Sequence, residues 1–168
     1  MSDNATSVTA YVVTACLDKL ARMPEFAALI DPEWRRLNRI LANGAADSPV
    51  KRALRRAPPG LALTFIDRAF VPGMMPHFLH RKRLVRREAE RAVARGATQV
   101  VVLGAGLDTL VWRLAPAHPS VRFVEVDLPG TQAAKLALLQ RAGAPPANCH
   151  YAPASPRPIE EVPALALA

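Results

Sequence analysis

Apolar residues in the first part of the chain follow the spacing of amphipathic helices. Between residues 7 and 22 they recur near a 3.6-residue period, which predicts a helix. Asp31-Pro32 and Ser48-Pro49 each place a capping side chain before a proline, as is typical of a helix start. The first of these helices should end near Asn43-Gly44, and the second should end at Pro58-Pro59-Gly60.

The second part of the chain alternates between helical and strand patterns. Val71-Pro72-Gly73 is a break, and a helix is expected over 77–95 with Gly96 as its C-cap. Short apolar runs with the character of buried parallel strands follow. These runs lie at about 99–103, 121–126 and 148–152. The expected class is therefore α/β, with N-terminal helices and the first three strands of a Rossmann-like, doubly wound sheet.

A glycine turn between the first strand and the next helix points to a binding site. Gly104-Ala105-Gly106 follows the strand directly, and the second strand ends in Asp127. Glycine permits a tight turn and a close approach of the backbone to a ligand. A carboxylate can accept hydrogen bonds from both hydroxyls of a ribose. The pattern predicts a nucleotide cradle at the carboxyl ends of the strands.

The residues after the turn bear on which nucleotide binds. A dinucleotide fingerprint has a third Gly or Ala where this chain has Thr109, and the neighbouring Asp108 is unfavourable for a pyrophosphate. S-adenosylmethionine has a sulfonium, an ammonium and an adenosine but no phosphate, so it is favoured. A dinucleotide-binding oxidoreductase fragment and a non-catalytic interaction module remain alternatives. Asp108 is also expected to cap the following helix.

The turn and its surroundings resemble the leucine carboxyl methyltransferase family. The resemblance rests on Gly104-Ala105-Gly106-Leu107-Asp108-Thr109, Trp112-Arg113-Leu114 and Glu125-Val126-Asp127-Leu128-Pro129, and extends from about Met74 to Tyr151. It implies a class I, S-adenosylmethionine-dependent O-methyltransferase that esterifies a carboxylate of a polyketide or another small metabolite. The cofactor-binding candidates on this segment are Gly104, Ala105, Gly106, Asp108, Asp127 and Leu128.

The same resemblance implies an arginine that holds the carboxylate of the cofactor's methionine moiety. Arg81-Lys82-Arg83 falls at that place, with Arg81 the first choice and Arg83 the second. The chain departs from the family at Arg86 and Arg87, where many members place acids. Trp112 and Arg113 are expected to be packing and surface residues. No catalytic residue is assigned, since displacement of an activated methyl depends mainly on alignment.

The resemblance also bears on how the chain is organised. Its seven-stranded sheet needs a longer chain than these 168 residues, which indicates a truncated gene product, a cofactor-binding fragment or a genuine half-domain. We expect a helical lid region at 1–73, a cofactor-binding half-domain at 74–152 and a frayed, proline-rich tail at 153–168. The first strand would then be an exposed edge that favours homodimers or other self-association.

The charge and composition of the chain limit the kinds of partner that it is expected to bind. The net charge is +8, and seven basic residues lie between Arg81 and Arg95. They are interpreted as a solvated helix face or as a field that attracts carboxylate substrates. Aromatic residues make up 5% and do not interleave with the basic run, which argues against nucleic-acid binding. No metal-ligand spacing, secretion signal or membrane-length apolar run is present, so we expect a cytoplasmic protein without a metal.

Overall fold

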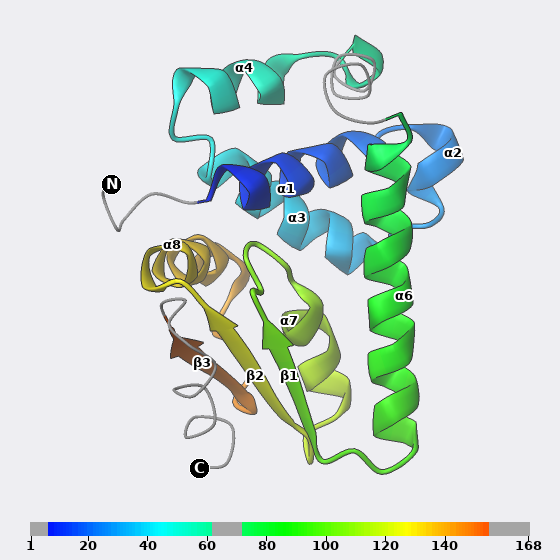
Figure 1. The fold of residues 1–168 in the computed structure, drawn as a ribbon, viewed down its shortest axis with the longest axis vertical. Helices are drawn as coiled ribbons and strands as arrows, with labels where there is room; N and C mark the ends of the chain where they lie inside the picture. The colour runs from blue at the N-terminus through cyan, green and yellow to red at the C-terminus, as the bar shows by residue number, and fades with distance from the viewer. Residues whose placement is uncertain (1–6, 62–71, 155–168) are drawn as a thin grey trace.

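A computed structural model describes residues 7–61 and 72–154 (Figure 1). The helices of the first part are α1 (Val8–Leu20), α2 (Pro24–Ala27), α3 (Pro32–Gly44), α4 (Pro49–Arg56) and α6 (Met74–Ala94). The second part contains β1 (Gln99–Leu103), α7 (Leu110–Leu114), β2 (Arg122–Asp127), α8 (Pro129–Leu139) and β3 (Cys149–Pro153). Short 3-10 turns follow α7 and α8, at Ala115–Ala117 and Gln140–Ala142.

The predicted helix starts are confirmed by their caps. The Asp31 carboxylate accepts a hydrogen bond from the backbone N–H of Trp34 at 2.7 Å, and α3 begins at the next residue, Pro32. The Ser48 hydroxyl caps α4 in the same way, accepting from the backbone N–H of Lys51 at 3.2 Å. The long helix predicted from residue 77 begins earlier, at Met74, because Gly73 has a left-handed φ of 81° and makes the break itself.

The three predicted strands form one parallel sheet with the order β1-β2-β3. The register pairs Val101 with Val124 and Phe123 with Cys149. The predictions for β2 and β3 were each displaced by one residue towards the N-terminus. Among the described residues, β1 is an edge strand, as predicted. The α/β class and the Rossmann-like arrangement are therefore confirmed for this part of the chain.

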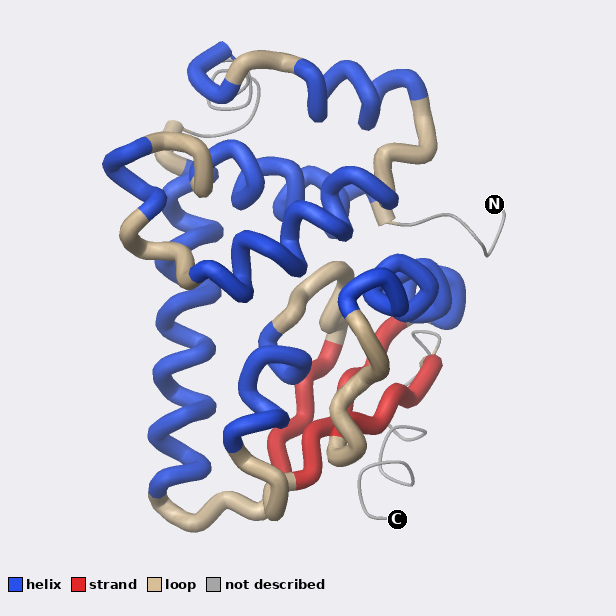
Figure 2. The backbone as a smooth tube through the Cα atoms, turned by 180° about the vertical axis from the view of Figure 1, so that it is seen from behind, coloured by secondary structure: helices blue, strands red, loops and turns tan. Residues whose placement is uncertain are grey.

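One face of the sheet is covered by helix. Val100 and Val102 pack with Phe123 against the apolar residues of α7. Successive side chains of a strand point to opposite faces, so Val101 and Leu103 lie on the other face, where they are 39% and 66% exposed. Figure 2 shows α7 lying directly against the strands in the view from behind.

The N-terminal helices form a layer above the carboxyl ends of the strands (Figure 1). Tyr11 of α1 and Leu37 of α3 share a buried cluster with Leu107 of the glycine turn, Trp112 of α7 and Leu139 of α8. The turn is therefore packed from above by α1 and α3. Whether this layer acts as a lid stays a prediction, and the expected frayed tail falls, from residue 155 on, outside the described residues.

No helix in the described part of the chain has the length and apolar character needed to cross a membrane.

Candidate functional site

A cavity of about 250 Å³ lies where the glycine turn, the end of β2 and the start of α1 meet. All but one of the predicted cofactor residues line it. They are Arg81, Gly104, Ala105, Gly106, Asp108, Asp127 and Leu128. The cavity is completed by Lys82 and Leu107, by Thr131 of α8, and by Ser7, Thr9, Ala10, Val13 and Thr14 at the start of α1. Segments distant in the sequence thus converge on the turn.

The two glycines of the turn have distinct roles. Gly104 and Gly106 adopt φ values of 63° and 53°, which disfavour residues with a side chain. A Cβ at Gly104 would meet no atom within 4 Å, so this backbone faces open space from which a ligand can approach. A Cβ at Gly106 would lie 3.2 Å from the Cβ of Ala10, so this glycine lets α1 approach the turn.

The Asp127 carboxylate fastens the turn to the end of β2. One oxygen accepts a hydrogen bond from the backbone N–H of Gly106, and the other accepts from the backbone N–H of Leu128 at 2.7 Å. An ionised carboxylate has about four acceptor positions, so these two bonds leave capacity for hydroxyl donors. The ribose role assigned to Asp127 stays a prediction, and the geometry is compatible with it.

Asp108 is held in its ionised form by Lys82. Burial favours the neutral acid, but the ion pair with the Lys82 ammonium outweighs it and lowers the pKa of Asp108 to about 2. The other Asp108 oxygen accepts from the backbone N–H of Leu110, the first residue of α7, at 2.9 Å. The N-cap position itself is Thr109 and not the predicted Asp108, which bonds to the start of the helix from one residue before that position. Sequence reasoning missed Lys82, whose only signal was its position between two arginines.

The two candidate arginines diverge in space. Arg81 lines the cavity at the glycine turn, whereas Arg83 lines other hollows on α6 and does not line this one. The two arginines share a hollow on the surface of α6, but only Arg81 also borders the glycine turn. The placement favours Arg81, and its role in holding a carboxylate stays a prediction.

The prediction for Arg113 as a surface residue is wrong. Its side chain is 3% exposed, and its guanidinium donates to Asp31 at 3.2 Å and to the Thr109 hydroxyl at 3.2 Å. The guanidinium also lies 4.6 Å from the centre of the Trp34 ring. Burial lowers the pKa of Arg113, although Asp108 and Asp31 oppose that effect. Trp112 is a packing residue as expected, at 7% exposure.

Glu125 of β2 makes a buried ion pair with α8 next to the site. It follows the same face of β2 as Asp127, and its carboxylate accepts from the Lys135 ammonium of α8 at 2.6 and 2.7 Å. The Gln132 amide donates to the Glu125 carbonyl at 3.1 Å. These bonds join α8 to β2, and Leu128, which lines the cavity, connects the two elements.

Together, these features define an α/β domain of the Rossmann-like class, in which a parallel sheet carries a glycine turn at the end of β1 and an acid at the end of β2. The sequence profile of the leucine carboxyl methyltransferase family matches residues 36–162, and the chain belongs to this family. The match confirms the predicted family and begins upstream of Met74, so it includes most of α3 and all of α4. No curated protein was found to match the chain.

Proposed function

We propose that these residues bind S-adenosylmethionine for transfer of its methyl group to a carboxylate of a small metabolite. Membership of a methyltransferase family gives the reaction class. The observation that carries the finer proposal is a single cavity that joins a glycine turn, the Asp127 carboxylate and the Arg81 guanidinium. These groups match the adenosine and amino-acid parts of the cofactor.

The chemistry of the lining supports this cofactor over a dinucleotide. Asp108 and Asp127 both border the turn, and Asp108 stays ionised because of Lys82. The acid at the end of β2 is expected on the ribose with either cofactor, so Asp108 makes the difference: a carboxylate where a pyrophosphate would sit is unfavourable for a phosphate ligand. It suits a ligand with positive centres. The open space above Gly104 lets such a ligand approach the backbone.

Each residue has a defined task in the proposal. Asp127 accepts hydrogen bonds from the ribose hydroxyls, and Arg81 pairs with the carboxylate of the methionine moiety. Leu128 offers an apolar contact for the adenine. The bound cofactor supplies a methyl group already activated by the sulfonium. The protein then contributes alignment and exclusion of water, for which the start of α1 forms a wall.

Calorimetric titration with S-adenosylmethionine and, separately, with NAD tests the cofactor. We expect binding of the first and not the second, with a reduced affinity for S-adenosylmethionine in Asp127→Ala. Glu88→Ala is the control, because Glu88 is 50% exposed and pairs with Arg91 away from the cavity. Binding of NAD instead would support the oxidoreductase alternative. Binding of neither ligand would contradict the proposal and leave the interaction module as the better explanation.

Methyl transfer from radiolabelled S-adenosylmethionine to a panel of small carboxylic acids tests the acceptor. Any radiolabelled product is expected to be a base-labile methyl ester, in low yield because the unpaired edge of β1 should make the chain self-associate. A product stable to base would show that the acceptor is not a carboxylate.

A further inference from the structure

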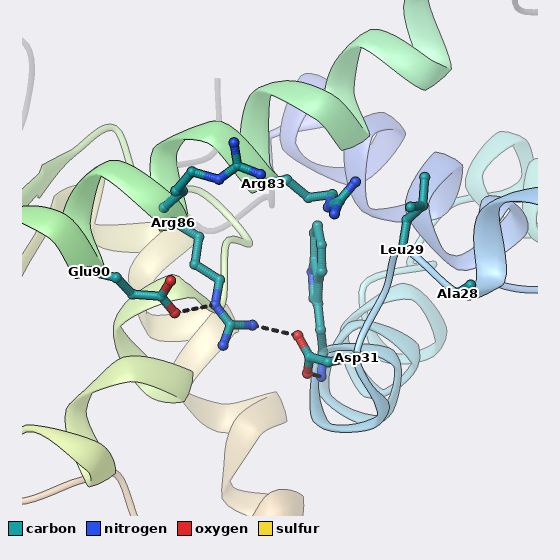
Figure 3. Close-up of a pocket in the computed structure, with 8 residues that line it drawn as sticks. Ala28, Leu29, Asp31, Arg83, Arg86 and Glu90 are labelled. Atoms are coloured by element: carbon teal, nitrogen blue, oxygen red, sulfur yellow. Dashed lines mark hydrogen bonds and ion pairs between the residues drawn. The ribbon is translucent and has the colours of Figure 1, made fainter.

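A second cavity, of about 290 Å³, lies between α6 and the segment that joins α2 to α3. It is lined by Arg83, Arg86, Arg87 and Glu90 from α6, by Ala28, Leu29 and Asp31 from the facing segment, and by Trp34 from the first turn of α3. In Figure 3 Arg86 reaches across from α6 to Asp31, and Glu90 lies on the other side of the Arg86 guanidinium. This cavity shares no lining residue with the one at the glycine turn.

The acids of the cavity are already committed to other partners. Arg86 donates to Asp31 at 2.6 Å and to Glu90 at 2.8 Å (Figure 3). The same Asp31 oxygen also accepts from the buried Arg113 at 3.2 Å. Asp31 is therefore shared between two guanidiniums, and Glu90 pairs with Arg86. The arginines that donate to these two carboxylates are thus Arg86 and Arg113, and not the other two arginines of the lining.

Arg83 and Arg87 are those remaining arginines. They are four residues apart on α6, so they lie on one side of the helix one turn apart. No described residue makes a hydrogen bond or an ion pair with either of them. Both also line a neighbouring hollow with His77, His80, Arg81 and Leu84. The lining thus holds two guanidiniums, the half-buried Arg83 and the exposed Arg87, that are not paired with a described residue.

We propose that this cavity binds the anionic oxygens of a small molecule, as a carboxylate or a phosphate group. A guanidinium presents two parallel N–H donors that match either group, and two guanidiniums one turn apart can hold one anion jointly. Arg86 is fixed by its two acids and supplies a third positive edge. Leu29 and Trp34 add an apolar wall for the body of the ligand. The proposal does not depend on the function of the glycine turn.

Titration calorimetry at constant ionic strength tests the site, with inorganic phosphate and benzoate as separate probes. We expect saturable binding of at least one probe, and the stronger one identifies the group that the site prefers. Arg83→Gln and Arg87→Gln should each weaken binding by about tenfold, the effect of losing a charged hydrogen bond. Arg91→Gln is the matched control, because Arg91 lies on the same helix and pairs with the exposed Glu88. Circular dichroism of each variant checks that it is folded.

Several results would overturn the proposal. Absence of saturable binding by both probes would do so, and so would an equal loss in Arg91→Gln, which would mean that only net charge matters. The titration is repeated with saturating S-adenosylmethionine. Persistent binding supports a separate site, whereas competition would place the anion at the glycine turn and refute it.

Discussion

The ion pair between Glu125 and Lys135 offers the sharpest test of the packing beneath the site. Both side chains are 1% exposed, and the ammonium contacts both carboxylate oxygens. The pair joins β2 to α8. Lys135→Met removes the positive partner while it keeps most of the buried volume, so the Glu125 carboxylate loses its compensation.

The expected cost follows from the burial of the pair. Removing one partner of a buried ion pair destabilises a protein by about 3–5 kcal/mol, because a charge is left in a medium that solvates it poorly. Replacement of both partners by apolar residues of similar volume is often neutral or stabilising. We therefore expect Lys135→Met to lose about 3–5 kcal/mol at neutral pH, and Glu125→Leu combined with Lys135→Met to recover most of it.

The cost should also depend on pH. Burial already raises the pKa of Glu125, against the opposing effect of Lys135, and loss of the ammonium raises it further. Between the ordinary pKa of glutamate and this raised value, the folded variant binds more protons than the unfolded chain. Its free energy of unfolding therefore falls as pH rises through this range. The penalty of Lys135→Met should be smaller at pH 5 than at pH 8.

Urea denaturation of both variants at the two pH values measures these differences. Arg91→Met is the control, since it breaks an exposed pair with Glu88 and should change stability by less than about 1 kcal/mol. A loss in Lys135→Met no larger than in the control would refute the reasoning. So would a double variant that is as unstable as the single one.

Three further predictions concern the cofactor and the sheet edge. Asp127→Ala should weaken S-adenosylmethionine binding by about 1–3 kcal/mol in calorimetry, and an unchanged affinity would make the ribose assignment wrong. Arg81→Lys should weaken that binding more than Arg83→Lys, because lysine lacks the planar fork; a larger loss at Arg83 would transfer the role to it. The edge strand Gln99–Leu103 should make the 168-residue chain self-associate, with weak or no methyl transfer. Sedimentation and a radiolabelled transfer assay measure both, and a stable monomer with ordinary turnover would contradict this prediction.

Local sequence signals predicted most of the elements, because their causes lie within a few residues. Caps such as Asp31 and the φ requirements of glycines such as Gly104 act on their immediate neighbours. The long-range pairs escaped prediction. Lys82 meets Asp108 and Arg113 meets Asp31 only after helices have packed on the sheet, and no local pattern encodes those partners. Arg113 looked like a surface residue for this reason, since its burial depends on Trp34 and Asp31 together.

Asp31 shows how the helical layer and the glycine turn are coupled. Its carboxylate begins α3 by capping Trp34, and it also accepts from Arg113 of α7. Arg113 in turn donates to Thr109, the last residue of the turn motif. One short chain of contacts thus joins the start of α3 to the turn that borders the cavity. The turn also shares its apolar cluster with α1 and α3. A substitution in the helical layer should therefore shift the position of the turn, even when the substituted residue does not contact the ligand.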